Sequence, residues 1–366
     1  MADLFDMFLV VQPGLESTLA DEAADLGFTV TGQAVGGVTI RGDWTTVWQA
    51  NLTLRGATRV LVRLAEFRAL HLAQLDKRAR RLAWGDWFHP GTAVEVDATC
   101  RKSRIYHHRA AAERVQTAIT DALGPPADDE ALSVKLRIED DLAVISLDTS
   151  GEALHRRGHK LKVNKAPMRE TLAAMFLRAC GYRGAEPVYD PMCGSGTFVL
   201  EAAEIAAGLA PGRARPFAFE ALASFDPQSF GRMKHRLTPV PQHRFYGSDR
   251  DQGAIAMSRE TADRAGVSHL TEFHLAPISD AAPPCETPGL VIANPPYGAR
   301  IGNKKPLYGL YAAFGEVMKE RFQGWRVAIV TSDGGLAKAT SLPFLPPGSP
   351  IDHGGIKVRL YQTDPL

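Results

Sequence analysis

The sequence predicts a multidomain α/β protein, in which two small α+β units precede a larger domain built on a mostly parallel sheet. Three observations support this class. The chain has 366 residues, enough for two or three domains. Strands and helices in the first 150 residues are ordered as two compact units, whereas from residue 167 they alternate regularly. Regular alternation is typical of a parallel sheet that is covered by helices on both faces.

The first expected unit, residues 1–65, has the element order βαββαβ, which is that of a small ferredoxin-like domain. Its helix over residues 15–26 carries Leu15 and Leu19 on one face, and Gly27 lies where a helix cap is expected. The other strands and the second helix are expected, in chain order, at residues 7–11, 28–30, 37–40, 44–52 and 59–67.

The second expected unit, residues 66–150, is also α+β. Gly124-Pro125-Pro126 ends its second helix, and Asp140-Asp141 joins its last two strands. Its helices are expected at residues 70–84 and 109–123, and its strands at residues 93–99, 133–139 and 142–148.

A basic linker is expected at residues 151–166. Its run LHRRGHKLKVNK, residues 154–165, contains five cations and no acidic residue, and it lacks apolar periodicity. We therefore expect an exposed arm.

The third expected domain, residues 167–366, carries the alternating elements. A Pro-rich stretch over residues 208–242 interrupts them, and because it is too long for an ordinary connection we expect an ordered insertion. Ligand sites in such sheets lie at the carboxyl ends of the strands. Helices are expected at residues 169–179, 196–207, 253–265 and 307–322, and strands at residues 187–189, 244–247, 271–274, 289–293 and 326–331.

The composition favours no particular partner. Lys and Arg number 42 against 41 Asp and Glu, so the net charge of +1 leaves any nucleic-acid site to local clusters. The four cysteines form no CxxC pair, which argues against a disulfide framework or a metal site and predicts a reduced, cytoplasmic protein. No signal peptide or membrane span is expected, and a monomer is favoured although the sequence leaves the oligomeric state open.

A glycine-rich loop is expected between a strand and a helix of the third domain. Glycines let the backbone approach a ligand closely, and a helix N-terminus offers free N–H groups, so a nucleotide-like ligand fits. The loop lacks the GxGxxG of a dinucleotide site and the Gly-Lys-Ser/Thr of a P-loop, and on the glycines alone a structural turn stays the alternative. The run is Asp190-Pro191-Met192-Cys193-Gly194-Ser195-Gly196-Thr197.

Two later motifs follow strands of the same expected sheet. Asp249 ends the next strand, where an acid in such folds accepts hydroxyl protons of a ribose. Asn294-Pro295-Pro296-Tyr297 follows the strand over residues 289–293. An Asn oxygen and a backbone carbonyl that accept both protons of an exocyclic amino group would aim its lone pair at a methyl donor. Prolines fix the backbone and the aromatic ring can stack on a base, so this motif predicts methylation of an amino group.

These motifs resemble those of class I S-adenosylmethionine-dependent methyltransferases that act on amino nitrogens. Further stretches are similar to the THUMP-domain RNA methyltransferases, particularly those that make N2-methylguanosine. The resemblance covers nearly the whole chain and implies a Rossmann-like class I methyltransferase domain preceded by ferredoxin-like and THUMP domains. The stretches are LHRRGH at residues 154–159, APMRETLA at 166–173, FAFE at 217–220 and GGIK at 354–357.

The resemblance implies S-adenosylmethionine as cofactor and a role for each candidate residue. Asn294, Pro295, Pro296 and Tyr297 are implied to hold the target amino group. One departure concerns the cofactor's adenine: the family has an acidic residue after the strand over residues 271–274, whereas this chain has Leu275-Ala276-Pro277 and Asp280 comes later. The residues implied to contact the cofactor are Pro167, Glu170, Thr171, Asp190, Met192, Cys193, Gly194, Ser195, Gly196, Thr197 and Asp249.

Two basic clusters are the candidate contacts to RNA, because cations on phosphates position RNA without reading its sequence. A solvated surface is the alternative for either cluster alone, but their position before an amino-methylating domain favours RNA. The residues are Arg101, Lys102, Arg104, His108, Arg156, Arg157, Lys160 and Lys162.

The predicted function is methylation of guanine N2 in a structured ribosomal or transfer RNA, with ribosomal RNA favoured. Adenine-N6 methylation of DNA or RNA stays an alternative, because Asn-Pro-Pro-Tyr serves both reactions. A non-catalytic RNA-binding factor is a second alternative, and it rests on the missing acid near Pro277.

Overall fold

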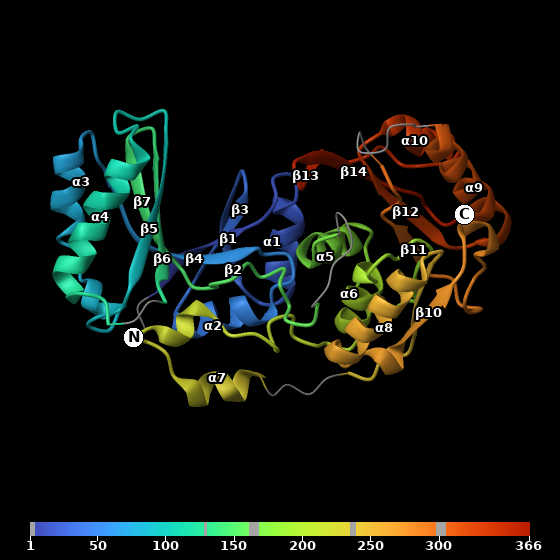
Figure 1. Ribbon diagram of the computed structural model, residues 1–366, viewed down its shortest axis with the longest axis horizontal. Coiled ribbons are helices and arrows are strands. Elements are labelled where there is room, and N and C mark those ends of the chain that lie inside the picture. The colour runs from blue at the N-terminus through green and yellow to red at the C-terminus, as the bar shows by residue number, and fades with distance from the viewer. Residues whose placement is uncertain (1–3, 128–129, 161–167, 235–238, 298–304) are drawn as a thin grey trace. The chain divides into compact units, whose positions relative to one another are not determined.

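The computed structural model describes residues 4–127, 130–160, 168–234, 239–297 and 305–366 (Figure 1). The chain divides into two compact units, and each is described by itself. Unit 1 comprises Met1–Val11, Ala20–Leu154 and Arg215–Arg236, and unit 2 comprises Gln12–Leu19, His155–Ala214 and Leu237–Leu366.

Unit 1 is built on one sheet with the strand order β2-β3-β1-β4-β7-β6-β5. The order β2-β3-β1-β4 is the antiparallel arrangement that a ferredoxin-like βαββαβ unit requires. In Figure 1, α3 and α4 lie beside the part of the sheet that contains β5, β6 and β7. The elements are β1 (Phe5–Val10), α1 (Glu16–Asp25, in this unit from Ala20), β2 (Thr29–Ala34), β3 (Gly37–Gly42), α2 (Trp44–Thr53), β4 (Arg59–Arg68), α3 (Leu72–Ala79), β5 (Val94–Arg101), α4 (His108–Leu123), β6 (Leu132–Glu139), β7 (Leu142–Asp148) and α7 (Pro227–Lys234).

Strand β4 runs through the expected boundary between residues 65 and 66. Its first residues pair with β1, and residues from Leu61 to Arg68 pair with β7, so the two predicted α+β units share a sheet. The division of this part into two domains therefore stays a prediction. The turn at Asp140 and Asp141 is as expected, because both have positive φ (49° and 63°) between the antiparallel strands β6 and β7.

The helix expected over residues 70–84 is wrong in its length, since α3 ends at Ala79. The indole N–H of Trp84 donates to the Ala79 carbonyl at 3.0 Å, and a short 3₁₀ turn, Trp84–Asp86, follows. The buried Trp84 ring, which needs a partner for its N–H, thus turns the chain back before the helix can continue.

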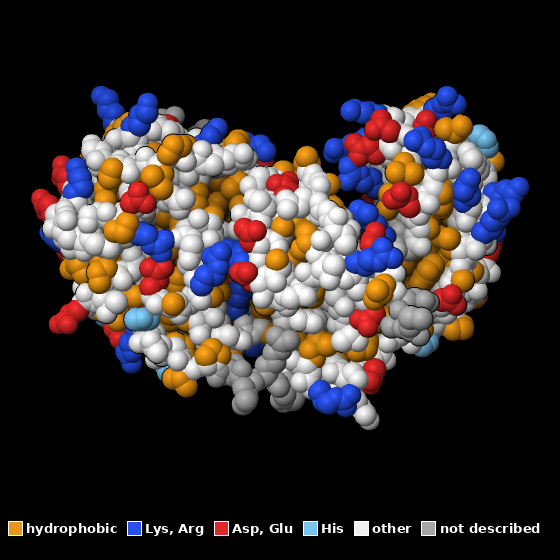
Figure 2. All heavy atoms as spheres, turned by 180° about the vertical axis from the view of Figure 1, so that it is seen from behind, with side chains coloured by type: hydrophobic (Ala, Val, Ile, Leu, Met, Phe, Trp, Pro, Cys, Tyr) orange, Lys and Arg blue, Asp and Glu red, His pale blue; other side chains and the backbone are white. Residues whose placement is uncertain are grey.

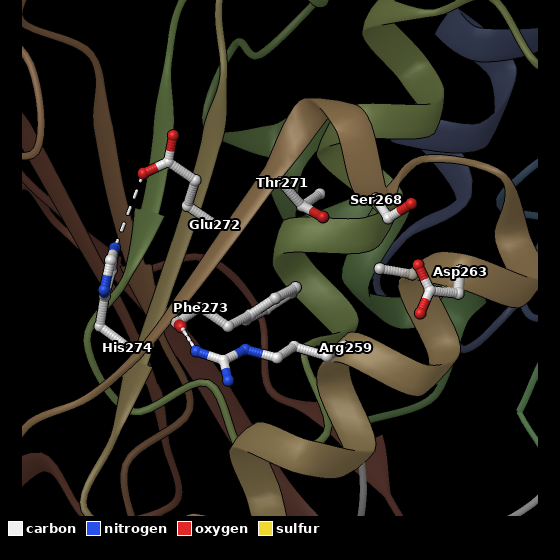
Figure 3. Close-up of a pocket in the computed structure, with 8 residues that line it drawn as sticks. Arg259, Asp263, Ser268, Thr271, Glu272, Phe273 and His274 are labelled. Carbon is white, nitrogen blue, oxygen red and sulfur yellow. Dashed lines mark hydrogen bonds and ion pairs between the residues drawn. The ribbon is translucent and has the colours of Figure 1, made fainter.

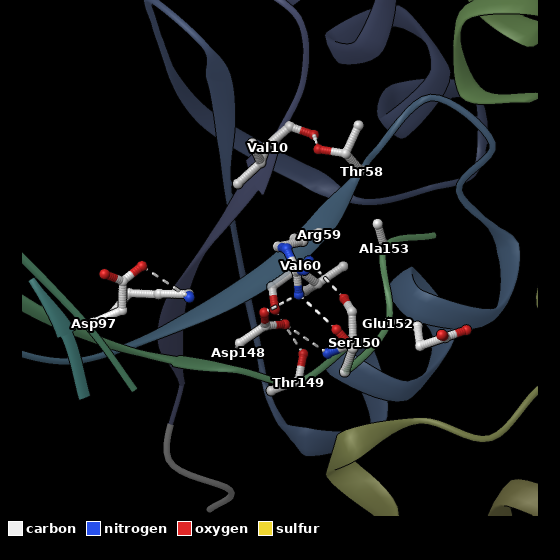
Figure 4. Close-up of polar contacts among 12 residues, drawn as sticks. Val10, Thr58, Arg59, Val60, Asp97, Asp148, Thr149, Ser150, Glu152 and Ala153 are labelled. Atoms are coloured by element: carbon white, nitrogen blue, oxygen red, sulfur yellow. Dashed lines mark hydrogen bonds and ion pairs between the residues drawn. The ribbon is translucent and has the colours of Figure 1, made fainter. Parts of the chain in front are cut away.

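A polar network joins the end of β7 to the start of β4 (Figure 4). Arg59 pairs with Asp148, whose side chain is fully buried. Burial raises the pKa of the Asp148 carboxyl, and the charge of Arg59 opposes that rise. Asp148 also accepts from the Ser150 N–H at 3.0 Å, while the Ser150 hydroxyl accepts from the Val60 N–H at 2.9 Å. The network fixes the chain where it leaves β7.

The expected ordered insertion is confirmed for its described residues, and its middle part belongs to unit 1. Phe219, Phe225 and Phe230 pack around Trp48 of α2, with ring centroids 5.7–6.5 Å from the indole. Arg215 donates to the carbonyls of Ser150, Glu152 and Ala153. The insertion therefore returns beside the segment where the chain left this unit.

Unit 2 contains a mostly parallel sheet with the order β10-β9-β8-β11-β12-β14-β13. The strands from β10 to β12 are parallel, and β14 and β13 are antiparallel to their neighbours. In Figure 1, α6 and α8 lie on one face and α9 and α10 on the other, as alternating elements predict. The elements are α5 (Glu170–Ala179), β8 (Val188–Asp190), α6 (Thr197–Ala206), β9 (Phe245–Asp249), α8 (Gln252–Ala265), β10 (Thr271–Leu275), β11 (Leu290–Ala293), α9 (Lys305–Arg321), β12 (Arg326–Thr331), α10 (Gly334–Ala339), β13 (Ile351–His353) and β14 (Ile356–Gln362).

The core of unit 2 lies between α9 and the central strands. Tyr311, Phe314 and Met318 of α9 pack against alternate residues of β11 and β12, including Val291 and Ile329. Across the described ranges, no helix is both long and apolar enough to cross a membrane.

Candidate functional site

Strand register brings the predicted motifs to one edge of the sheet in unit 2. Asp190 at the end of β8 pairs with Gly247, so Asp249 lies two residues beyond it on β9. On the other side of β8, Val291 pairs with Tyr189, which puts Asn294 two residues beyond the level of Asp190. The carboxyl ends of three adjacent parallel strands therefore present the three motifs together, where ligands bind in such sheets.

The glycine-rich loop is held in a fixed shape by its neighbours. The Gly194 N–H donates to Asp249 Oδ2 at 2.9 Å, and the Gly194 carbonyl accepts from the Ser258 hydroxyl at 3.0 Å. Gly194 and Gly196 have positive φ (53° and 76°), which glycine adopts without strain. A Cβ at Gly194 would meet no atom within 4 Å, so open space lies beside this backbone. The loop leaves room for a ligand close to its main chain.

Asp190 is a buried carboxyl beneath this loop, with 2% of its surface exposed. It accepts from the Met192 N–H at 3.0 Å. Burial raises the pKa of Asp190 well above its ordinary value, and the nearby charge of Asp249 raises it further; no cation of the described chain acts on it. Since a buried anion without a cation is costly, this edge of the sheet would favour a positively charged ligand.

The start of α5 faces the helix that follows the glycine-rich loop. Lys160 Nζ lies 2.9 Å from Glu170 Oε1 and donates to the Thr197 hydroxyl at 2.8 Å. Thr171, next to Glu170, has a buried hydroxyl that finds no partner among the described residues. Glu170, Thr171 and Thr197 thus lie in one region, as the resemblance implies. Pro167, a further predicted cofactor contact, lies outside the described residues.

The expected exposed arm is wrong for its described part. Arg157 is buried and donates to Glu201 Oε1 at 3.1 Å, and the Lys160 side chain is only 11% exposed. Both cations are engaged by carboxylates rather than presented to solvent, so the surface that a phosphate contact needs is missing there. Arg156 is exposed, and Lys162 lies outside the described residues.

Two further acidic partners of this segment, Glu201 and Glu204, come from one helix, α6. Glu201 pairs with Arg157, and Glu204 lies 2.8 Å from Arg213 and 3.6 Å from His159 Nε2. Burial lowers the pKa of His159, against the effect of Glu204. This buried ion network anchors residues 155–160 to the helix whose first turn follows the glycine-rich loop.

The Asn-Pro-Pro-Tyr motif, residues 294–297, combines an unsatisfied acceptor with anchored neighbours. Asn294 Oδ1 is buried and accepts no hydrogen bond from any described residue. The Tyr311 hydroxyl lies 3.4 Å from the Pro296 carbonyl, and the Tyr297 hydroxyl lies 2.8 Å from His353 Nδ1. A buried acceptor without a donor costs about 1–3 kcal/mol, a cost that an incoming N–H group would remove.

The other basic cluster, Arg101 to Arg109, runs from the last residue of β5 through the following loop to the first turn of α4 in unit 1. Arg101, Lys102, Arg104 and His108 are exposed, and Tyr106 among them is 70% exposed. The positive charge of this cluster is partly balanced, since Arg104 Nε lies 3.9 Å from Asp141 Oδ2. Figure 2 likewise shows basic and acidic side chains interspersed over the visible face. The cations and the tyrosine of this cluster therefore form a small local patch, and the described side chains of the face in view (Figure 2) form no extended area of positive charge.

A pocket of about 380 Å³ lies elsewhere in unit 2, between the edge strand β10 and α8 (Figure 3). Its lining mixes both charges, including Arg259, Asp263 and Glu272, and contains none of the predicted site residues. Arg259 donates to the Phe273 carbonyl, so its cation is engaged within the fold. We assign this pocket no role in the chemistry.

Two family models match the chain. Residues 157–343 match the model of an RMKL-like methyltransferase domain, and residues 6–61 match that of an RlmL ferredoxin-like domain. The second match confirms the ferredoxin-like fold expected for the first unit.

The chain is similar to curated proteins over almost its full length. Ribosomal RNA large subunit methyltransferase K/L of Chromohalobacter salexigens is 33% identical over 360 residues, 92% of this chain and 49% of the relative. The K/L protein of Syntrophotalea carbinolica is 36% identical over 356 residues, 90% of this chain and 50% of the relative. The chain thus spans about half the length of these relatives. A Synechocystis protein provisionally named an RNA methyltransferase is 30% identical over 374 residues, 98% of this chain and 96% of its own.

Solved structures share the fold. A possible methylase from Clostridium difficile 630 has a TM-score of 0.92 at 28% identity, covering 100% of this chain and 99% of that one. A provisionally assigned methyltransferase complexed with SAH gives 0.91 at 26% identity with the same coverage. A Listeria monocytogenes protein, described by prediction as an N6-adenine-specific DNA methylase, gives 0.90 at 28% identity over 99% and 97% of the chains. These similarities confirm the class I methyltransferase fold.

Proposed function

This chain belongs to the RMKL-like methyltransferase family, and from that membership we propose that it methylates the N2 amino group of a guanosine in structured RNA, with ribosomal RNA favoured and S-adenosylmethionine as methyl donor. The K/L relatives carry a ribosomal RNA methyltransferase name, and they are about twice as long as this chain. The observation that carries the proposal is the buried Oδ1 of Asn294 at the carboxyl end of β11, which finds no donor among the residues that the structure describes.

The residues at the sheet edge fit the cofactor. Its sulfonium and ammonium groups are cations, and the charge of Asp249 makes that edge negative. Gly194 offers open space beside its backbone for close approach. We propose that Asp249 accepts from the ribose hydroxyls, and that Glu170 and Thr171 lie along the methionine end. When bound, the cofactor supplies an activated methyl group, so the protein's own task is alignment.

Asn294 performs the central alignment in this proposal. Its Oδ1 accepts one proton of the guanine amino group, and a backbone carbonyl of the motif accepts the other. The nitrogen lone pair, otherwise delocalised into the ring, is then directed at the methyl group. The Tyr297 ring stacks on the base, and the proton released after transfer passes to solvent or to Asn294. No covalent intermediate is needed, so Cys193, a buried thiol whose pKa is raised by burial, serves in packing.

RNA binding is assigned to the exposed loop Arg101 to Arg109 and to a THUMP domain over residues 66–150. The supporting observations are the exposed cations and the exposed Tyr106 on one loop, which suit phosphates and a base respectively. We also propose a cytoplasmic location, which is supported by four unpaired cysteines.

Adenine-N6 methylation is the competing reaction, because Asn-Pro-Pro-Tyr serves both and one structural relative is described in those terms. A non-catalytic factor is the other competitor. Calorimetric titration with S-adenosylmethionine and turnover on ribosomal RNA separate them. We expect wild type to bind and to turn over, and Asn294→Ala to keep cofactor affinity while losing most turnover. Absence of cofactor binding would favour the factor, and unchanged turnover in Asn294→Ala would remove that residue from the mechanism.

A further inference from the structure

Tyr297 is tethered by a residue that lies 56 positions away in the sequence. Its hydroxyl lies 2.8 Å from Nδ1 of His353, and this hydrogen bond is partly buried within unit 2. His353 is only 9% exposed, whereas Tyr297 is half-buried. One edge of the tyrosine is thus fixed inside the protein while part of the residue stays accessible.

The hairpin of β13 and β14 holds His353 in place. His353 pairs with Ile356 and Ile351 pairs with Val358, so these four residues share a face of the hairpin. Gly354 and Gly355 form its turn, with φ of 63° and 84°. Because β14 also pairs with β12, the hairpin is continuous with the sheet that ends in the candidate site. His353 therefore acts from a rigid element rather than from a free loop.

We propose that His353 is a positioning residue for methyl transfer: its hydrogen bond to the Tyr297 hydroxyl sets the plane on which the target base stacks. This inference rests on the proposed function. A tyrosine ring that is free to swing would place the stacked base, and hence its amino group, at varying distances from Asn294 Oδ1. Alignment errors near 1 Å can lower a rate by about a hundredfold.

The hydroxyl of Tyr297 gives a way to separate this role from packing. Tyr297→Phe keeps the stacking ring and removes only the tether, and His353→Ala removes the other end. Asparagine places a polar atom near the position of Nδ1, so His353→Asn is the conservative rescue. If the two side chains act through one hydrogen bond, the double variant should be no worse than either single variant.

The test measures steady-state methylation of RNA and affinity for SAH in these four variants. We expect Tyr297→Phe and His353→Ala each to lower kcat about 10- to 100-fold with unchanged SAH affinity, the double variant to match them, and His353→Asn to recover most of the rate. Unchanged kcat in His353→Ala, or additive losses in the double variant, would overturn the positioning role.

A readout on the free protein keeps this inference distinct from the proposed function. NMR relaxation of ¹³C-labelled tyrosine rings reports the mobility of Tyr297 without any RNA. Increased ring mobility in His353→Ala supports the tether even if wild type fails to methylate guanosine, which would remove the proposed function alone. An equally rigid ring in His353→Ala contradicts the tether whatever the substrate.

Discussion

The backbone N–H of Gly194 donates to the carboxylate of Asp249 across 2.9 Å, joining the turn after β8 to the end of β9. Asp249 also accepts, through its other oxygen, from the Asp251 N–H at 3.0 Å. One side chain thus shapes the glycine-rich loop and supplies negative charge where we propose the cofactor ribose binds. Its two tasks make it the first residue to test.

Asp249→Ala should raise the Kd for S-adenosylmethionine at least tenfold, which corresponds to about 1.4 kcal/mol. The variant loses both the ribose acceptor and the anchor of the loop. Calorimetric titration measures the change. Asp263→Ala is the matched control, because Asp263 is an exposed carboxylate of α8 that lines only the pocket to which we assign no role. Equal affinities in both variants would refute the role of Asp249.

Gly196→Ala should destabilise the fold by about 1–2 kcal/mol or more, because a Cβ there combines a φ of 76° with contacts of 3.0 Å to Ser258 Oγ and 3.1 Å to Phe273. Urea denaturation measures the free energy of unfolding. Gly231→Ala in α7 is the control: its Cβ would meet nothing within 4 Å, and we expect stabilisation of up to about 1 kcal/mol. Equal effects at both positions would contradict the tight packing at Gly196.

Asp190 should make stability fall as pH rises. Burial raises its pKa in the folded state above the unfolded value, so its contribution is fully present below the unfolded pKa, near 4, and is lost as pH rises through the folded pKa. Asp190→Asn removes this titration and keeps an oxygen for the Met192 N–H. Thermal unfolding from pH 4 to pH 8 should therefore show the variant gaining on wild type as pH rises. A constant difference would argue against the raised pKa.

Arg157→Met should destabilise unit 2 by about 3–5 kcal/mol, because it removes the buried cation that pairs with the buried Glu201. Adding Glu201→Leu should restore most of that loss by removing the buried negative charge as well. Arg250→Met, at an exposed cation, is the control and should stay within about 0.5 kcal/mol of wild type. Chemical denaturation measures the free energy of unfolding of each variant. A loss below about 1 kcal/mol in Arg157→Met would indicate that the Arg157 guanidinium is exposed to solvent rather than buried.

Reversing charge at Arg101 and Lys102 should weaken RNA binding and flatten its dependence on salt by about one unit of slope per lost phosphate contact. Lys77→Glu, on the exposed side of α3 in the same unit, is the control and should bind RNA as wild type does. Filter binding over a range of salt concentrations gives both values. Unaltered slopes in the reversed variant would leave the loop as ordinary solvated surface.

Motif residues that are adjacent in the sequence were the predictable part of the site. Asp190 to Thr197 and Asn294 to Tyr297 each form a short turn after a strand, so local composition indicates their position. Parallel strand order then brings them together, as the alternation of elements predicts.

The ion network could not be found in this way, because its charges come from distant segments. Arg157 and His159 look like part of a solvated run, and their partners follow about 45 residues later in the sequence. A signal does exist: Glu201 and Glu204 are the two acids of α6, a helix otherwise composed of apolar residues and one threonine. Acids in such a helix require buried cations, which the basic run supplies.

Strand β14 and His353 were also missed. The alternation of Ile356, Val358 and Leu360 is the period-two signal of a strand with one buried face, and it would have predicted β14. Nothing in the sequence connects His353 to Tyr297, because only the antiparallel pairing of β14 with β12 brings the hairpin beside the motif.

Mass-spectrometric nucleoside analysis of cellular RNA, with and without this gene, tests the central claim most directly. We predict that N2-methylguanosine at one ribosomal RNA position disappears without the gene, returns with the wild-type protein and does not return with Asn294→Ala. Loss of N6-methyladenosine instead, or unchanged N2-methylguanosine in every RNA fraction, would contradict it.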